Sequence, residues 1–280
     1  MKTLYVTDLD GTLLDAEGRV SARSAALLNE AIAGGAAFTV ATARTPATVA
    51  PLLADVDMRL PAVVMTGAAL WNPKTGIYSD PRYISREAVD DLIEIYTREG
   101  VGSFLYTLRD NHIDIYHLGS LSPQEKEFMR LREGTPFKDF HIPPEDALKA
   151  GILPREHVVL LFAMQEKEPV CRVYDRVCEA GVDCSPLHYH DTYGPESELM
   201  EVFSPSATKG KALRRLRERL GVERMVVFGD QVNDIPMMKE ADWAVAVENA
   251  VPEVKAAANE IIGANTEDSV SRYIRAHAGS

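Results

Sequence analysis

Two carboxylates, Asp8 and Asp10, follow a short apolar run near the start of the chain, in the stretch LYVTDLDGTLL. Burying such a pair at the end of a strand is costly unless a cation compensates it. One carboxylate can attack phosphorus to form an acyl phosphate, and the other can protonate the leaving oxygen and later activate water. Residues i and i+2 of a strand share a side, so we expect both to face one site. The alternative is a polar turn after a strand.

Thr42 and Arg44 follow a second apolar run, residues 36–41 (AAFTVA). A hydroxyl at this place can hydrogen-bond a phosphoryl oxygen, and Arg44 can hold the loop or the substrate. Taken alone, the better explanation is a helix N-cap at Thr42 or Thr45, because Pro46 suits the first helical turn.

Lys209 lies in the segment SPSATKGKAL, at the start of a predicted helix. An ammonium there can neutralise a phosphoryl group or a nucleophilic carboxylate as a point charge. A solvated surface lysine is the simpler alternative for Lys209 taken alone. Lys211, at the same helix start, is the competing candidate.

The segment GDQVND, residues 229–234, crowds Asp230, Asn233 and Asp234 behind an apolar strand. Carboxylate and amide oxygens suit Mg²⁺, which also keeps waters and takes phosphate oxygens as ligands. The alternative is a capped turn between a strand and a helix. The crowding of three such side chains behind an apolar strand favours a cation site.

Elements at both ends of the chain must position these clusters. Short, almost wholly apolar strands alternate with helices, which predicts a doubly wound parallel sheet of the Rossmann-like α/β class. Ligands bind at the carboxyl ends of the strands in such sheets, where all four clusters lie. The expected core strands are residues 4–6, 36–41, 62–65, 225–228 and 243–247; the expected helices begin at Ser21 and span about 46–54, 209–220, 235–240, 251–258 and 268–276.

The middle of the chain has a different pattern. It combines a helix (85–99), a hairpin of strands 103–108 and 113–117, a capping box at Ser122 and Glu125, a strand (158–163) and a helix (169–180). These elements predict an inserted α+β domain with an antiparallel sheet. We expect a core of residues 1–82 and 194–280 and an insertion of residues 83–193.

Composition restricts the partners. The chain has 280 residues, 46% of them hydrophobic, and a formal net charge of -12. Nucleic acid and anionic membrane surfaces are therefore not expected partners, and a phosphate site needs local cations. Three cysteines without a Cys-x-x-Cys motif, no signal peptide, and no apolar run near the roughly 18 residues of a membrane span indicate a cytoplasmic protein.

The motifs DLDGTLL, ATAR, KGKAL and GDQVNDI resemble, in order and context, the four motifs of the haloacid dehalogenase superfamily. The chain is most similar to the Cof-type phosphatases, which carry a large α/β cap between the second and third motifs. The resemblance covers the core by motif and the cap by position and size. The family usually has Gly in place of Ala43, Asn in place of Thr66, and often Gly where this chain has Asp268-Ser269.

The resemblance implies a role for each matching residue. Asp8 is implied as the nucleophile, Asp10 as the general acid and base, Thr42 as the hydroxyl of the second motif and Lys209 as the lysine of the third. The implied Mg²⁺ ligands are Asp8, Asp10 through its backbone carbonyl, Asp230, and Asp234, which supports Lys209 or a metal-bound water. The implied phosphate or substrate contacts are Leu9, Thr42, Ala43, Arg44 and Asn233.

Three functions remain open on these grounds. The leading one is a Mg²⁺-dependent phosphatase acting on a small phosphorylated metabolite, with a sugar phosphate as the expected class. The second is a phosphotransferase or mutase that passes the same aspartyl-phosphate to a sugar hydroxyl. The third is a non-catalytic module that binds a phosphometabolite, against which the intact catalytic set argues. No dinucleotide-binding G-x-G-x-x-G is present, and the oligomeric state is not indicated.

The expected cap would select the substrate, but no motif in it identifies the contacts. The candidates there are His112, His117, His188, His190 and Lys138. A surface histidine or an ordinary hairpin residue is the simpler explanation for each of them.

Overall fold

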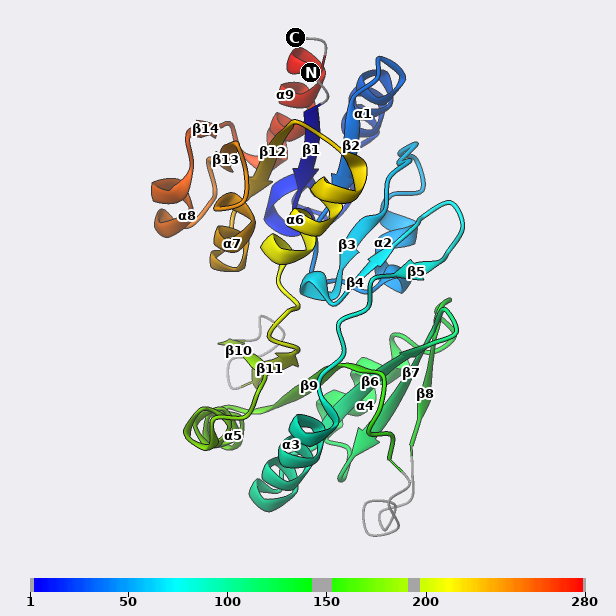
Figure 1. Cartoon of the computed structure of the whole chain (residues 1–280), viewed down its shortest axis with the longest axis vertical. Helices are drawn as coiled ribbons and strands as arrows, with labels where there is room; N and C mark the ends of the chain where they lie inside the picture. The colour runs from blue at the N-terminus through cyan, green and yellow to red at the C-terminus, as the bar shows by residue number, and fades with distance from the viewer. Residues whose placement is uncertain (1–2, 143–152, 191–196, 279–280) are drawn as a thin grey trace. The chain divides into compact units, whose positions relative to one another are not determined.

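The computed structural model describes residues 3–142, 153–190 and 197–278. Contacts divide the chain into two units, which Figure 1 shows: a core unit of residues 1–80 and 207–280, and an inserted unit of residues 81–206. The return to the core therefore comes after Ser206, rather than after Tyr193 as the sequence suggested. The physical reason is β11 (Ser197–Phe203), which pairs with strands of the inserted unit.

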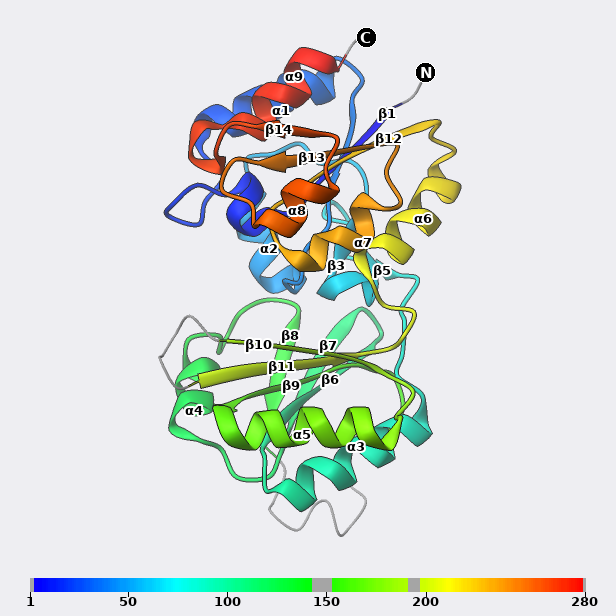
Figure 2. The ribbon, with the colours of Figure 1, turned by 90° about the vertical axis from the view of Figure 1, so that its left-hand side faces the viewer.

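The core unit is built on a five-stranded sheet in the order β14-β13-β12-β1-β2, and every neighbouring pair is parallel. Helices α1 and α9 cover one face, and α6, α7 and α8 cover the other (Figure 2). This doubly wound arrangement confirms the predicted fold class. The strands are β1 (Thr3–Thr7), β2 (Ala37–Val40), β12 (Arg224–Gly229), β13 (Trp243–Val247) and β14 (Glu260–Ile262). The helices are α1 (Ala22–Ala33), α2 (Pro46–Leu52), α6 (Lys209–Leu220), α7 (Ile235–Met238), α8 (Pro252–Ala257) and α9 (Ser269–His277).

The third predicted core strand, β3 (Ala62–Val64), is not a full member of the parallel sheet. It pairs antiparallel with β4 (Ala69–Trp71), which pairs with β5 (Tyr78–Ser79). A single parallel bridge, Ala41–Val63, links it to the end of β2. The chain reverses after β3 because Met65, Thr66 and Gly67 all take positive φ, which starts a tight turn instead of a crossover.

The inserted unit contains a six-stranded sheet in the order β10-β11-β9-β6-β7-β8. Its pairs are antiparallel, as predicted, except for the parallel pair β7–β8. Its strands are β6 (Ser103–Arg109), β7 (His112–Leu118), β8 (Lys138–His141), β9 (Val158–Glu166), β10 (Ser185–His190) and β11. Its helices are α3 (Arg86–Glu99), α4 (Pro123–Arg130) and α5 (Lys167–Ala180). The predicted capping box at Ser122 and Glu125 is confirmed.

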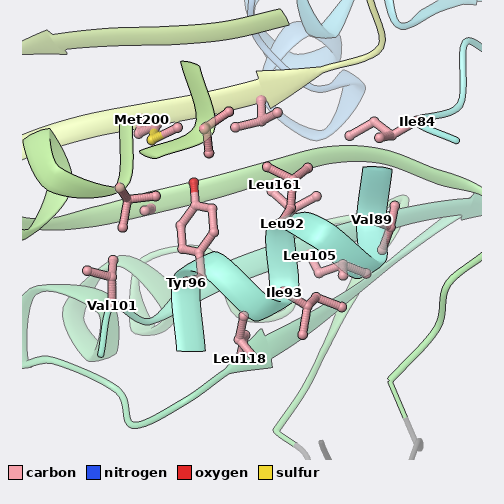
Figure 3. Close-up of a cluster of buried hydrophobic side chains, with 14 of the residues drawn as sticks. Ile84, Val89, Leu92, Ile93, Tyr96, Val101, Leu105, Leu118, Leu161 and Met200 are labelled. Atoms are coloured by element: carbon pink, nitrogen blue, oxygen red, sulfur yellow. The ribbon is translucent and has the colours of Figure 1, made fainter. Parts of the chain in front are cut away.

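One face of this sheet packs against α3 and α5, whose apolar stripes form the core of the inserted unit. Figure 3 shows Val89, Leu92 and Tyr96 of α3 directed at Leu105 and Leu161 of the sheet. Helix α3 begins at a Ser85 cap and ends at Gly100 in the left-handed conformation, so local signals fix its length. Among the described helices of the chain, none is long and apolar enough to cross a membrane.

Candidate active site

Lys209 joins two carboxylates at the carboxyl end of the core sheet. Its Nζ donates hydrogen bonds to Asp8 Oδ1 at 2.8 Å and to Asp234 Oδ1 at 2.7 Å. Asp8 directly follows β1, Lys209 is the first residue of α6, and Asp234 ends the turn after β12. The Lys209 side chain is only 1% exposed. Lys211, the competing candidate, is exposed, and its backbone N–H donates to Thr208 Oγ1, so Lys209 is the lysine of this helix start that lies between the two carboxylates.

Asp234 also shapes the loop that follows β12. Its Oδ2 accepts hydrogen bonds from the backbone N–H groups of Asp230, at 2.9 Å, and Gln231, at 3.1 Å. A Cβ at Gly229 would lie 2.6 Å from the Asp234 Cβ, so only glycine permits this close turn. Both Asp234 oxygens thus already accept hydrogen bonds, Oδ1 from Lys209 and Oδ2 from the loop backbone.

Asp230 completes the buried cluster. Its Oδ1 accepts a hydrogen bond from Thr12 Oγ1 at 2.7 Å, and its Oδ2 accepts one from Gln231 Nε2 at 3.2 Å. Gly11, at φ +70°, allows the chain to pass beside it, because a Cβ there would lie 2.4 Å from Asp230 Oδ2. The sequence analysis assigned no role to Thr12. A hydroxyl one residue after an Asp-x-Asp-Gly turn was the available signal.

The cluster suits a divalent cation. Asp8, Asp230 and Asp234 are buried, and each offers an oxygen within 4.8 Å of those of the others. Burial raises the pKa of Asp8, although Lys209 opposes the shift, and burial raises that of Asp230 to about 6. Although burial alone would lower the pKa of Lys209, Asp234 and Asp8 raise it, so this cation is fixed. Three carboxylates facing one ammonium form an oxygen-rich site with excess negative charge, as Mg²⁺ requires.

Asp10 does not share a strand side with Asp8, in contrast to the sequence prediction. Strand β1 ends at Thr7, and Asp10 lies in the following turn, Leu9–Leu13, where Gly11 takes positive φ, so strand alternation does not relate Asp10 to Asp8. Its side chain is 55% exposed and forms a bidentate pair with Arg44, whose Nε and Nη2 donate at 2.7 and 2.6 Å. The sequence analysis placed Asp10 and Arg44 in different clusters, but in the structure their side chains form one ion pair.

The remaining predicted phosphate contacts take different positions. Thr42 is buried, and its Oγ1 accepts a hydrogen bond from the Arg44 N–H at 3.1 Å instead of capping a helix. Leu9 has a buried side chain, and its backbone N–H hydrogen-bonds Asp8. Ala43 is half-buried and Asn233 is exposed.

Thr66 marks a strained point next to this loop. Its backbone is left-handed at φ 54°, and its N–H donates to the Thr42 carbonyl at 3.0 Å. Its buried Oγ1 has no hydrogen-bond partner among the described residues. A strained residue with an unsatisfied buried hydroxyl is typical of functional sites.

The histidine candidates of the inserted unit mostly have carboxylate partners. His112 Nε2 lies 3.0 Å from Asp139, and His188 Nε2 lies 3.1 Å from Glu198. His117 is buried 3.4 Å from Glu125. The side chain of His190 lies outside the described residues. Lys138 is buried without such a partner in the described part of the chain.

Comparison with known proteins identifies the class. The family model for haloacid dehalogenase-like hydrolases matches residues 5–274, so the chain belongs to this family. A Thermotoga maritima protein of known structure has a TM-score of 0.78 at 25% identity, over 99% of this chain and 97% of that one.

Two curated relatives of the chain are named phosphatases. A 5-amino-6-(5-phospho-D-ribitylamino)uracil phosphatase of Bacillus subtilis is 28% identical over 98% of this chain and 97% of its own. A pyridoxal phosphate phosphatase of Escherichia coli is 26% identical over 96% of each chain. The protein is accordingly a phosphatase of the Cof type.

Proposed function

We propose that this phosphatase hydrolyses the phosphate monoester of a small metabolite, with a sugar phosphate as the substrate class, through an aspartyl-phosphate on Asp8 in a Mg²⁺-dependent reaction. The observation that carries the proposal is the buried bridge from Lys209 Nζ to Asp8 at 2.8 Å and to Asp234 at 2.7 Å. A nucleophilic carboxylate fixed by an ammonium at the carboxyl end of a parallel sheet suits attack on phosphorus.

In the first step an Asp8 carboxylate oxygen attacks phosphorus, and the bond from phosphorus to the ester oxygen breaks. Asp10 donates its carboxyl proton to the departing oxygen, so the alcohol leaves neutral. Lys209 neutralises charge beside Asp8 during the transfer. The Arg44 contacts position the Asp10 side chain, which enters this step with the proton that it took from water in the preceding turnover.

In the second step water attacks the phosphorus of the aspartyl-phosphate. Asp10, now a carboxylate, takes a proton from that water, and the bond from phosphorus to Asp8 breaks, which releases inorganic phosphate. Asp8, Asp230 and the backbone carbonyl of Asp10 would hold Mg²⁺, with Asp234 supporting Lys209. When bound, this cation supplies charge neutralisation for the phosphoryl oxygens.

The Asp8→Asn variant tests the nucleophile. We expect kcat to fall by at least about 10³-fold while the fold is retained, because the amide cannot form the acyl phosphate. Acid quenching of wild-type protein with ³²P-labelled substrate should trap label on Asp8. Asp57→Asn, which changes an exposed carboxylate of the core unit, is the control. Substantial turnover or trapped label in Asp8→Asn would reject the assignment.

Removing the metal tests the cation site. We expect chelation to stop hydrolysis of p-nitrophenyl phosphate and added Mg²⁺ to restore it, because excess negative charge in the cluster otherwise repels the phosphoryl group. Asp230→Asn should raise the Mg²⁺ concentration needed for half-maximal rate by at least about tenfold. Turnover that is insensitive to chelation would remove the metal from the mechanism.

The substrate class needs a screen. The two named relatives act, by their names, on a phosphoribityl compound and on pyridoxal phosphate. We therefore expect phosphate release from hexose and pentose phosphates to exceed release from p-nitrophenyl phosphate in kcat/KM. An isomerised sugar phosphate that accumulated before inorganic phosphate would instead indicate a mutase.

A further inference from the structure

The turn after β1, which carries Asp10, is held by side chains that follow β13 and β14. Inside this turn, Leu9–Leu13, Asp10 has ψ 126° and Gly11 has φ +70°, so neither is helical. A backbone hydrogen bond from the Leu14 N–H to the Leu9 carbonyl, at 2.9 Å, joins its two ends. A turn of this shape cannot satisfy its backbone groups by a regular helical ladder, so partners from other segments help to fix it.

Asn249, two residues after the end of β13, supplies one such partner. Its Nδ2 donates a hydrogen bond to the Gly11 carbonyl at 2.7 Å, and its Oδ1 accepts one from the Asn265 backbone N–H at 3.0 Å. A carbonyl only accepts and an N–H only donates, so these two partners fix the orientation of the amide. Asn249 is exposed, so packing in the core does not explain an asparagine at this position.

Asn265, three residues after the end of β14, holds the far end of the same turn. Its Nδ2 donates a hydrogen bond to the Leu14 carbonyl at 2.7 Å. Because its backbone N–H also reaches Asn249, the two asparagines form one hydrogen-bonded bridge that spans the turn from Gly11 to Leu14.

The Gly11 end of this bridge lies against the acidic cluster. Gly11 passes beside the Asp230 carboxylate, and Thr12 Oγ1 donates to Asp230 Oδ1 at 2.7 Å. The backbone N–H of Val251 donates to the Asp230 carbonyl at 3.0 Å. Residues 249–251 therefore join the turn after β1 to the loop after β12, and both of these carry acidic residues of the site.

We propose that Asn249, assisted by Asn265, is a positioning residue of this phosphatase that acts through the Gly11 carbonyl. By fixing this peptide, it places Asp10 for proton transfer and Asp230 for cation binding. The roles of Asp10 and of the cation in this statement rest on the proposed function, whereas the hydrogen-bonded bridge does not.

A matched pair of aryl phosphates tests the effect on proton transfer. p-Nitrophenol is a far stronger acid than phenol, so its anion departs from phosphorus without a proton, whereas departure of phenol needs the proton of Asp10. At saturating Mg²⁺ we expect Asn249→Ala to lower kcat/KM for phenyl phosphate by at least about tenfold, and to lower kcat/KM for p-nitrophenyl phosphate much less. A general loss of folded protein would lower both values equally.

The thermal midpoint supplies a measurement that does not depend on turnover. Mg²⁺ should raise the midpoint of wild-type protein, because a ligand of the folded state stabilises it. We expect Asn249→Ala to need at least about tenfold more Mg²⁺ for the same rise, because Asp230 is then held less firmly.

Asn259→Ala is the matched control. Asn259 Oδ1 accepts a hydrogen bond from the Ala244 backbone N–H at 2.8 Å, near the start of β13 and therefore at the opposite edge of the core sheet from the site. This variant also loses a hydrogen bond between a side chain and the backbone, but it should change neither the ratio of the two aryl phosphates nor the Mg²⁺ response. Asn265→Ala, which releases Leu14, should share the selective losses of Asn249→Ala.

The comparison of these variants decides the proposal. Selective losses in Asn249→Ala that Asn259→Ala does not share would support it, and equal behaviour of the three variants in both measurements would overturn it. If Asn249→Ala did not fold, Asn265→Ala would decide by the same measurements. A wild-type midpoint that Mg²⁺ did not move would overturn the cation-binding part. If wild-type protein hydrolysed neither aryl phosphate, the proposed function would fail, and the Mg²⁺ response would still decide whether the bridge positions Asp230.

Discussion

Gly11 lies where the chain passes beside the Asp230 carboxylate. An added Cβ would lie 2.4 Å from Asp230 Oδ2, and the backbone already has φ +70°. Gly18 has the same φ, but an added Cβ there meets no atom within 4 Å. The two positions therefore separate backbone strain from displacement of the carboxylate.

We expect Gly18→Ala to lower the free energy of unfolding by about 1–2 kcal/mol through left-handed strain alone. Gly11→Ala should lower it by a further ~1–3 kcal/mol and weaken Mg²⁺ activation by at least about tenfold, because Asp230 must move. Urea unfolding and Mg²⁺ titration of the rate measure both effects. Equal losses in the two variants, with unchanged Mg²⁺ activation, would contradict this account.

At the scale of the elements, local signals predicted helices better than strand partners. Helix α6 runs from Lys209 to Leu220 as predicted, because the apolar spacing and Gly221 define it. Strand β11 mixes apolar residues with Glu198 and Glu201, and it pairs with β9 and with β10, a strand that the sequence analysis did not predict. Without β10 as a partner, β11 was assigned to the core. The short strand β14 (EII) has only three residues and one of its two isoleucines, Ile261, is exposed, so its apolar run was too short to predict a strand.

The site was predictable in its residue types but not in all of its contacts. Asp8, Lys209, Asp230 and Asp234 meet because each follows or begins an element at one edge of the sheet. The Asp10–Arg44 pair was not predictable, because it depends on the end of β1 at Thr7 and on the turn that follows. The end of β1 and the turn after it are determined by strand pairing with distant parts of the chain, and residue spacing alone does not reveal them.

Strand β8 begins with Lys138, a charged side chain whose burial lowers the stability of the folded protein. Its pKa of about 8 in the folded protein lies below the unfolded value of about 10.4. Below pH 8 the folded state bears the full free-energy cost of desolvating this ammonium in part. Between pH 8 and about 10.4 the unfolded chain binds more protons at this site, so the free energy of unfolding rises with pH.

We expect Lys138→Met to raise the free energy of unfolding at pH 7 by ~1–3 kcal/mol, and its advantage over wild type to shrink between pH 8 and 10. Tyr106, on the same face of the sheet as Lys138, stays neutral there, since burial raises its pKa. Arg132 and Glu201 also act electrostatically on Tyr106. Urea unfolding at several pH values, with Lys126→Met at an exposed position of α4 as the control, measures this. A destabilised Lys138→Met at pH 7 would contradict the penalty.

At the scale of the whole molecule, the inserted unit contains its own sheet and its own buried core. We expect a fragment of residues 81–206 to fold alone and unfold cooperatively by circular dichroism. A fragment of residues 83–193, cut at the boundaries that the sequence suggested, should not, because it lacks β11, which lies between β9 and β10. Equal behaviour of the two fragments would show that the sheet does not depend on β11.

The order of strands in the core sheet has a consequence for synthesis on the ribosome. Strand β1 lies between β2 and β12, but β12 is translated only after the whole inserted unit. Until β12 emerges, the nascent chain presents one open edge of β1, and Asp8 has neither Lys209 nor Asp234 beside it. The inserted unit is contiguous in the chain and can fold first. The open edge of β1 therefore stays available for pairing with other chains throughout the synthesis of the inserted unit.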